Sequence, residues 1–190
     1  MQAIFETLFD IVYLVTVITL GIRMIWNSRG ERQYLLYGVM AVTLGCGDAF
    51  HLVPRAVALC TTGLENYTAA LGIGKLVTSV TMTLFYVLLY YVWRARYQVS
   101  GKTGTTASVW VLALARIALC LMPQNAWTSA APPLSWGIYR NIPFTILGVL
   151  IVVLFADTVP AVGMLMIPKT CAYVWAVLIG FNAMKGRNNG

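Results

Sequence analysis

A carboxylate, an imidazole and a guanidinium stand at helical spacing in the stretch LGCGDAFHLVPR, residues 44–55. His51 and Arg55 follow Asp48 by three and seven positions, so on a helix all three side chains share one face. A carboxylate can protonate a substrate or activate water, and an imidazole beside it can relay the protons. Asp48 and His51 are therefore the candidate catalytic pair.

Asp48 lies inside a segment that is long and apolar enough to cross a membrane. It stands fifteen positions beyond Gln33, a distance of roughly 22 Å along a helix, which puts it in the outer third of the span. A carboxylate at mid-bilayer costs about 2.5–3.5 kcal/mol on insertion scales, and less near an interface. A chain keeps such a group only where it is paired, hydrated or used.

The chain as a whole is strongly apolar. Of its 190 residues, 59% are hydrophobic and 10% are charged, against roughly 25% charged in a soluble domain; the mean hydropathy is +0.77. Its apolar runs are continuous, whereas the strands of a transmembrane barrel alternate. These features predict an all-α polytopic transmembrane helical bundle that forms a single integral membrane domain over residues 1–190.

Six apolar runs have the length of a membrane-crossing helix, and they cover about residues 4–26, 33–53, 69–93, 106–122, 142–156 and 161–184. Pro54 is expected to end the second run and Pro123 the fourth. The segment 124–141 holds two successive prolines and two tryptophans, which indicates an interfacial loop. The sequence thus predicts about six spans.

Basic residues mark one side of the predicted bundle. They gather in and beside the linkers 27–33 and 94–105, and they are Arg23, Arg29, Arg32, Arg94, Arg96 and Lys102. Because Lys and Arg concentrate in cytoplasmic loops, we expect both linkers in the cytoplasm of a cell-membrane protein with its N-terminus outside. Six spans would place the C-terminus outside too, against the basic Lys185 and Arg187, so either the tail or the count departs from the rule.

Further polar groups are expected near the outer surface. Lys75 enters the third run close to its outer end, and Arg140 and Asn141 open the fifth run from the same side. The face of the third run that carries Lys75 continues through Ser79 to Tyr86. We expect an outward-facing pocket between the second, third and fifth runs, with these ligand-binding residues: Lys75, Ser79, Tyr86, Arg140 and Asn141.

A purely structural interpretation of the outer groups stays open. Asp48 could form a buried ion pair with Lys75 or Arg55 that only fixes the register of the helices.

A second polar cluster is expected deeper, on the cytoplasmic half, and its members are Arg116, Asp157 and Lys169. Charges within spans usually face the bundle interior. Asp157 and Lys169 could form a salt bridge there, while Arg116 could extend its guanidinium toward a polar surface.

No cofactor and no metal are expected. The chain holds one histidine and four scattered cysteines, which do not make a zinc or haem site. It has no Walker loop, GxSxG, HExxH, CxxC or Gly-rich dinucleotide fingerprint.

The net charge of +7 does not predict nucleic-acid binding, because the basic residues stand at the ends of apolar runs, where they meet anionic lipid head groups. The expected partners are membrane lipids and a small amphiphilic ligand. Homo- or hetero-oligomerisation in the membrane is left open.

The stretch 44–55 resembles the Gly-Asp-Ala-containing transmembrane motif of the lysoplasmalogenase family, and the matching positions are Gly47, Asp48, Ala49, Phe50, Leu52 and Pro54. That family consists of multispanning membrane enzymes that hydrolyse the vinyl-ether bond of lysoplasmalogens. The resemblance implies that Asp48 takes the place of an intramembrane acidic residue of that chemistry. The chain departs from the family pattern at His51, where an apolar residue is usual, and in its smaller number of spans.

Three functions fit these observations. The first is an intramembrane hydrolase for an ether or vinyl-ether lipid, with Asp48 as the acid and His51 as the proton partner. The second is a non-enzymatic binder, such as a substrate-capturing transport subunit or a receptor for an amphiphile. The third is a structural membrane subunit whose charges only specify assembly.

Overall fold

The computed structural model describes residues 2–61 and 63–158, which contain helices and no strand. The helices are α1 (Gln2–Trp26), α2 (Arg32–Cys60), the short 3₁₀ helix η1 (Leu64–Tyr67), α3 (Thr68–Arg96), α4 (Thr103–Leu121), the 3₁₀ helix η2 (Pro123–Asn125) and α5 (Leu134–Thr158). Residues 1–149 form one compact unit, and a second unit begins at residue 150. The single domain over the whole chain stays a prediction.

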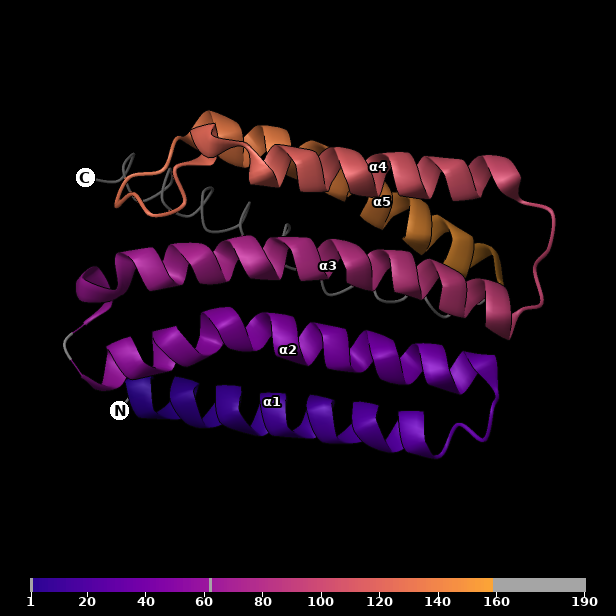
Figure 1. Cartoon of the computed structure of the whole chain (residues 1–190), viewed down its shortest axis with the longest axis horizontal. Coiled ribbons are helices and arrows are strands. Elements are labelled where there is room, and N and C mark those ends of the chain that lie inside the picture. The colour runs from indigo at the N-terminus through magenta and orange to yellow at the C-terminus, as the bar shows by residue number, and fades with distance from the viewer. Residues whose placement is uncertain (1, 62, 159–190) are drawn as a thin grey trace, which may run out of the picture. The chain divides into compact units, whose positions relative to one another are not determined.

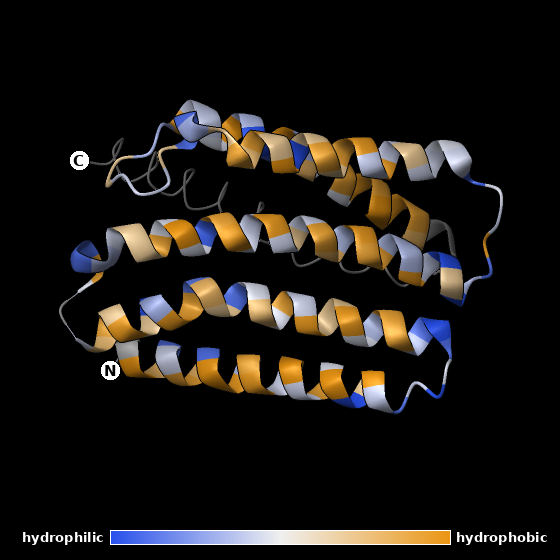
Figure 2. Cartoon of the chain, in the orientation of Figure 1, coloured by the Kyte–Doolittle hydropathy of each residue, from blue (hydrophilic) through white to orange (hydrophobic). Residues whose placement is uncertain are grey.

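Five of these helices are long and apolar enough to cross a membrane, and Figure 2 shows apolar residues on every one of them. The outer surface of α1 is covered by large apolar side chains: Phe5 is 72% exposed and Phe9 64%. Exposing such an apolar surface to water is unfavourable, whereas its contact with lipid tails is not. The prediction of an all-α multi-pass membrane bundle is therefore confirmed. The sixth predicted span, 161–184, lies outside the described residues.

Neighbours in sequence are neighbours in space: α1 packs on α2, α2 on α3, and α3 on α4 (Figure 1). The loops α1–α2 and α3–α4 lie at one end of the unit formed by residues 1–149. The opposite end holds the α2–α3 turn and the α4–α5 loop, where Gly72 touches the backbone of Trp127. The two basic linkers thus share one end, as the charge pattern requires.

Glycine allows α2 and α3 to approach closely. A Cβ at Gly47 would collide with the side chain of Thr81, and a Cβ at Gly74 would collide with Phe50 O and the Cα of His51. Thr78 Oγ1 also donates to Gly47 O across this interface, at 3.1 Å. Small residues commonly allow the backbones of membrane helices to approach closely. Here they allow the α2 segment that carries Asp48 and His51 to pack directly on α3.

Two predicted boundaries were wrong, and proline explains both. The second helix does not stop at Pro54 but continues to Cys60. Pro54 cannot bond to Phe50 O, and that freed carbonyl faces the open space at Gly74. Likewise, α5 begins at Leu134 and not at 142, so the expected loop 124–141 ends sooner. The two prolines before Leu134 suit a helix start, where no intrahelical N–H bond is lost.

Candidate functional site

Asp48 is held from α1. The Tyr13 hydroxyl donates a hydrogen bond of 2.8 Å to Asp48 Oδ2, and the carboxylate is half-buried. The sequence analysis missed Tyr13 as a partner, although it lies on the N-terminal half of the first apolar run. The Asp48 carboxylate therefore has a neutral donor at one oxygen.

Arg55 is paired elsewhere. Its guanidinium Nη2 lies 2.9 Å from Glu6 Oε2, with the two side chains 41% and 32% exposed. Within residues 2–61 and 63–158 this is the one salt bridge between side chains. The expected ion pair of Asp48 with Lys75 or Arg55 is accordingly not what the structure shows.

His51 lies half-buried on the α2 side of the α2–α3 interface. Its Nδ1 atom is buried and has no hydrogen-bond partner among the residues that the structure describes. His51 is thus a half-buried imidazole whose Nδ1 is free to bond to a ligand or a water.

Lys75 follows Gly74 on α3 and is exposed. Ser79 sits one turn further and donates its hydroxyl to Lys75 O at 2.7 Å. That bond occupies the Ser79 proton locally, so Ser79 retains only acceptor capacity for a ligand. We define the seam site as Asp48, His51 and Lys75: the close contact at Gly74 brings α3 next to Lys75 against His51, while Asp48, one turn before His51 on α2, bonds to α1.

Arg140 and Asn141 do not join the seam site but a separate group, which we name the arginine cluster. Its members are Arg116, Asn125, Trp127, Arg140 and Asn141. Arg116 Nη1 donates to Arg140 O at 2.8 Å and to Asn141 Oδ1 at 2.9 Å. Arg140 Nη1 in turn donates to Asn125 Oδ1 at 2.8 Å. The expected pocket between Lys75 and Arg140 stays a prediction, while the bonds of Arg140 and Asn141 lie within this network.

The expected second polar cluster of Arg116, Asp157 and Lys169 stays a prediction, although its one described member bonds to Arg140 and Asn141. Arg116 stands five residues before the end of α4 at Leu121, so it lies at the same end as the start of α5. The Asp157 side chain and Lys169 fall outside the described residues.

Aromatic faces and amides surround the two arginines of the cluster. Arg116 is 4% exposed and its Cζ lies 3.8 Å from the centroid of the Phe144 ring. The Arg140 Cζ lies 4.1 Å from the Trp127 ring centroid. Such contacts are worth about 2 kcal/mol where the cation is desolvated. The cluster therefore links α4 to the first part of α5 and stabilises their contact.

Tyr86, expected to bind ligand, packs edge-on against Phe144 with ring centroids 5.1 Å apart. It extends the apolar contact between α3 and the first part of α5. Tyr86 therefore lies beside the arginine cluster, and its predicted role toward a ligand stays a prediction.

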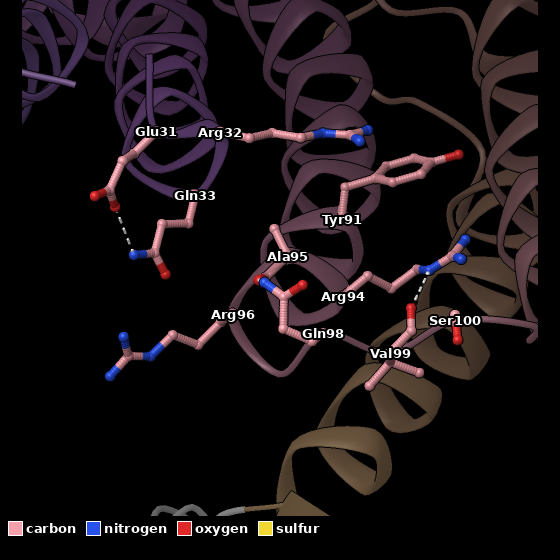
Figure 3. A pocket seen from close by; sticks show the side chains of 10 residues that line it. All are labelled: Glu31, Arg32, Gln33, Tyr91, Arg94, Ala95, Arg96, Gln98, Val99 and Ser100. Atoms are coloured by element: carbon pink, nitrogen blue, oxygen red, sulfur yellow. Dashed lines mark hydrogen bonds between the residues drawn. The ribbon is translucent and has the colours of Figure 1, made fainter. Parts of the chain in front are cut away.

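A cavity that the sequence analysis did not anticipate opens at the end with the basic linkers. Its volume is about 760 Å³, and Figure 3 shows the side chains around it. The lining residues are Glu31, Arg32, Gln33, Tyr91, Arg94, Ala95, Arg96, Gln98, Val99 and Ser100. The clustered arginines of the two linkers could have indicated this cavity, but the sequence analysis used them only to predict the orientation in the membrane.

For the part of the chain that the structure describes, no three His, Cys, Asp or Glu side chains gather as a metal site would require. Comparison with known proteins found no matching family model, no matching curated protein and no matching solved structure. The function must therefore be argued from the residues themselves.

Proposed function

We propose that this multi-pass membrane protein binds an amphiphilic, lipid-like molecule at the seam site, with the polar head at Asp48, His51 and Lys75. The observation that carries the proposal is the buried Nδ1 of His51, which has no hydrogen-bond partner within residues 2–61 and 63–158. A buried polar nitrogen without a partner costs free energy comparable to a lost hydrogen bond. A ligand or a water that binds there removes that cost.

The charges around His51 favour a zwitterionic or anionic head group. Lys75 supplies an ammonium and Asp48 a carboxylate with one oxygen not engaged by Tyr13. Apolar helix surface continues on both sides of the interface, with Phe50 and Ile73 58% and 51% exposed. Polar anchors beside apolar surface suit a molecule with a charged head and a hydrocarbon tail.

Hydrolysis is the chemical extension of this binding, and the resemblance of residues 44–55 to the lysoplasmalogenase motif supports it. Asp48 would transfer its proton to the vinyl-ether carbon, leaving an oxocarbenium ion. Water would then add to that ion while His51 Nδ1 takes the proton that the water loses. The hemiacetal breaks into an aldehyde and an alcohol, and the proton returns from His51 to Asp48.

A structural role for Asp48 is the second candidate, and the Tyr13 bond favours it. That bond joins α1 to α2 at 2.8 Å, as the Arg55–Glu6 pair does near the outer end. In this case Asp48 stabilises the contact between α1 and α2, and only His51 of the candidate catalytic pair would contact a ligand.

A turnover assay separates these candidates. Protein purified in detergent is mixed with a lysoplasmalogen, and aldehyde release is measured. If the protein is a hydrolase, Asp48→Asn abolishes release while the fold persists, because Asn keeps the shape but has no proton to give. Amphiphile binding without aldehyde release identifies a binder. Absence of both, with loss of stability in Asp48→Asn alone, establishes the structural role and overturns the proposal.

A further inference from the structure

The cavity at the basic end has two arginines and a tyrosine directed to one side. Figure 3 shows the side chains of Arg32, Tyr91 and Arg94 extending in one direction, with the Tyr91 ring between the two guanidinium groups. The carboxylate of Glu31 extends the opposite way, where it accepts a bond of 3.1 Å from Gln33. We name Arg32, Tyr91 and Arg94 the basic groove.

Arg94 is fixed in position by its neighbours. Its Nε donates to Val99 O and its Nη1 to Thr106 Oγ1, both at 3.2 Å. These bonds leave Nη2 and one hydrogen of Nη1 for another acceptor. Because the guanidinium is held before any ligand arrives, little conformational entropy is lost on binding.

Tyr91 presents its hydroxyl proton. Trp110 Nε1 donates to the Tyr91 hydroxyl oxygen at 2.9 Å, and the indole nitrogen can only donate. The Tyr91 hydroxyl is therefore the acceptor in that bond, and its own proton remains available for a second hydrogen bond.

Arg32 is exposed, and no carboxylate among the described residues forms a salt bridge with it. Within the ranges that the structure describes, the one salt bridge is between Arg55 and Glu6 at the other end, so neither Arg32 nor Arg94 faces a paired carboxylate. Two guanidinium groups and a hydroxyl donor on one cavity wall match the oxygen atoms of a phosphate group.

The groove lies at the depth of lipid head groups. The α3 helix has 29 residues and is therefore roughly 43 Å long, which exceeds the hydrocarbon core of about 30 Å. Its last turns, which carry Tyr91 and Arg94, reach beyond that core. A phosphate held there can belong to a lipid or be dissolved in water.

We propose that the basic groove binds a phosphate group, with Arg32 and Arg94 as the cationic clamp and Tyr91 as the hydroxyl donor. This site is separate from the seam site and stands whether or not an amphiphile binds there. An anionic phospholipid and free phosphate share this chemistry, and the experiment distinguishes them.

The test measures binding of short-chain phosphatidic acid to the full-length protein in detergent by native mass spectrometry. We expect Arg32→Gln and Tyr91→Phe each to weaken binding, about tenfold for the charged contact. Arg29→Gln is the matched control, because it removes the same charge from the same loop region but does not line the cavity. It should change the dissociation constant less than twofold, and so should Asp48→Asn.

A second arm adds inorganic phosphate at millimolar concentration. Displacement of the lipid identifies free phosphate as a ligand of the groove, whereas no displacement identifies the lipid head group; both outcomes support a phosphate site. The proposal is overturned if wild-type protein binds neither. It is equally overturned if Arg32→Gln and Tyr91→Phe bind as tightly as wild-type protein, or if Arg29→Gln loses as much affinity as Arg32→Gln.

Discussion

The Tyr13 hydroxyl on α1 donates a hydrogen bond of 2.8 Å to Oδ2 of Asp48 on α2. This bond gives the carboxylate a neutral partner on another helix, while the guanidinium of Arg55, seven positions further along α2, is engaged by Glu6. Tyr13 thus engages Oδ2 of Asp48 and leaves Oδ1 for a further partner.

Tyr13→Phe removes that bond and leaves the ring in place. Interhelical hydrogen bonds in membrane proteins contribute about 0.6 kcal/mol on average and up to roughly 1.7, and we expect a loss of unfolding free energy in this range. Unfolding in SDS followed by circular dichroism gives the value. Tyr37→Phe on α2 is the control and should leave stability unchanged, so equal losses in both variants would contradict a specific bond at Asp48.

Gly74→Ala should destabilise the bundle, because the added methyl group meets Phe50 O and the Cα of His51. Backbone atoms cannot move aside as a flexible side chain can, and overpacking of this kind costs about 1–3 kcal/mol. Gly104→Ala, in the first turn of α4 with nothing near the new methyl group, should be neutral or slightly stabilising. A thermal unfolding scan of the two variants in the same detergent tests the difference. Identical unfolding temperatures would show that α2 and α3 do not approach at Gly74.

Asn125→Ala should lower the stability of the protein by removing the cap at the C-terminal end of α4. The Asn125 side chain is fully buried, and its Nδ2 donates to Leu119 O, Cys120 O and Met122 O at 2.6, 3.3 and 2.9 Å. Truncation leaves buried carbonyls and the Arg140 guanidinium without this partner, at a cost of about 1–3 kcal/mol. The neighbouring exposed Gln124→Ala should stay within about 0.5 kcal/mol of wild type. A loss at Gln124 as large as that at Asn125 would argue against the capping role.

The helices and the membrane class could be predicted from sequence because an apolar run long enough to cross a bilayer has few alternatives to a helix. The C-terminal end of α2 could not be predicted from the sequence. Pro54 ordinarily ends a helix, and its tolerance here depends on Gly74, which belongs to another helix and leaves room at Phe50 O.

The partners of the polar residues were harder to predict than the residues themselves. Asp48 and Arg116 stand out in sequence because they are charged within apolar runs. Their bonds to Tyr13 and Asn141 depend on which helices are adjacent and on where each helix ends. Depth counted along the chain grouped Arg116 with Asp157 and Lys169, whereas its hydrogen bonds join it to Arg140 and Asn141 in the first part of α5.

The orientation in the membrane is a prediction from charge, and labelling tests it. In a variant without native cysteines, single cysteines are introduced as Asn27→Cys, Lys102→Cys and Ala130→Cys, all at exposed positions. A membrane-impermeant maleimide added to intact cells should label only Ala130→Cys, because basic loops stay in the cytoplasm. Labelling of the first two but not the third reverses the orientation and the depth assigned to both sites.

The most direct test of the seam site is the affinity of purified protein for a zwitterionic lysophospholipid, measured for wild type, Asp48→Asn and Lys75→Met. Each substitution removes one charge-assisted contact of about 1.5–3 kcal/mol, so we predict that each weakens the dissociation constant at least tenfold. Arg32→Gln, at the opposite end, should leave this affinity unchanged. Wild-type affinity in both Asp48→Asn and Lys75→Met, with unchanged thermal unfolding, would contradict the account.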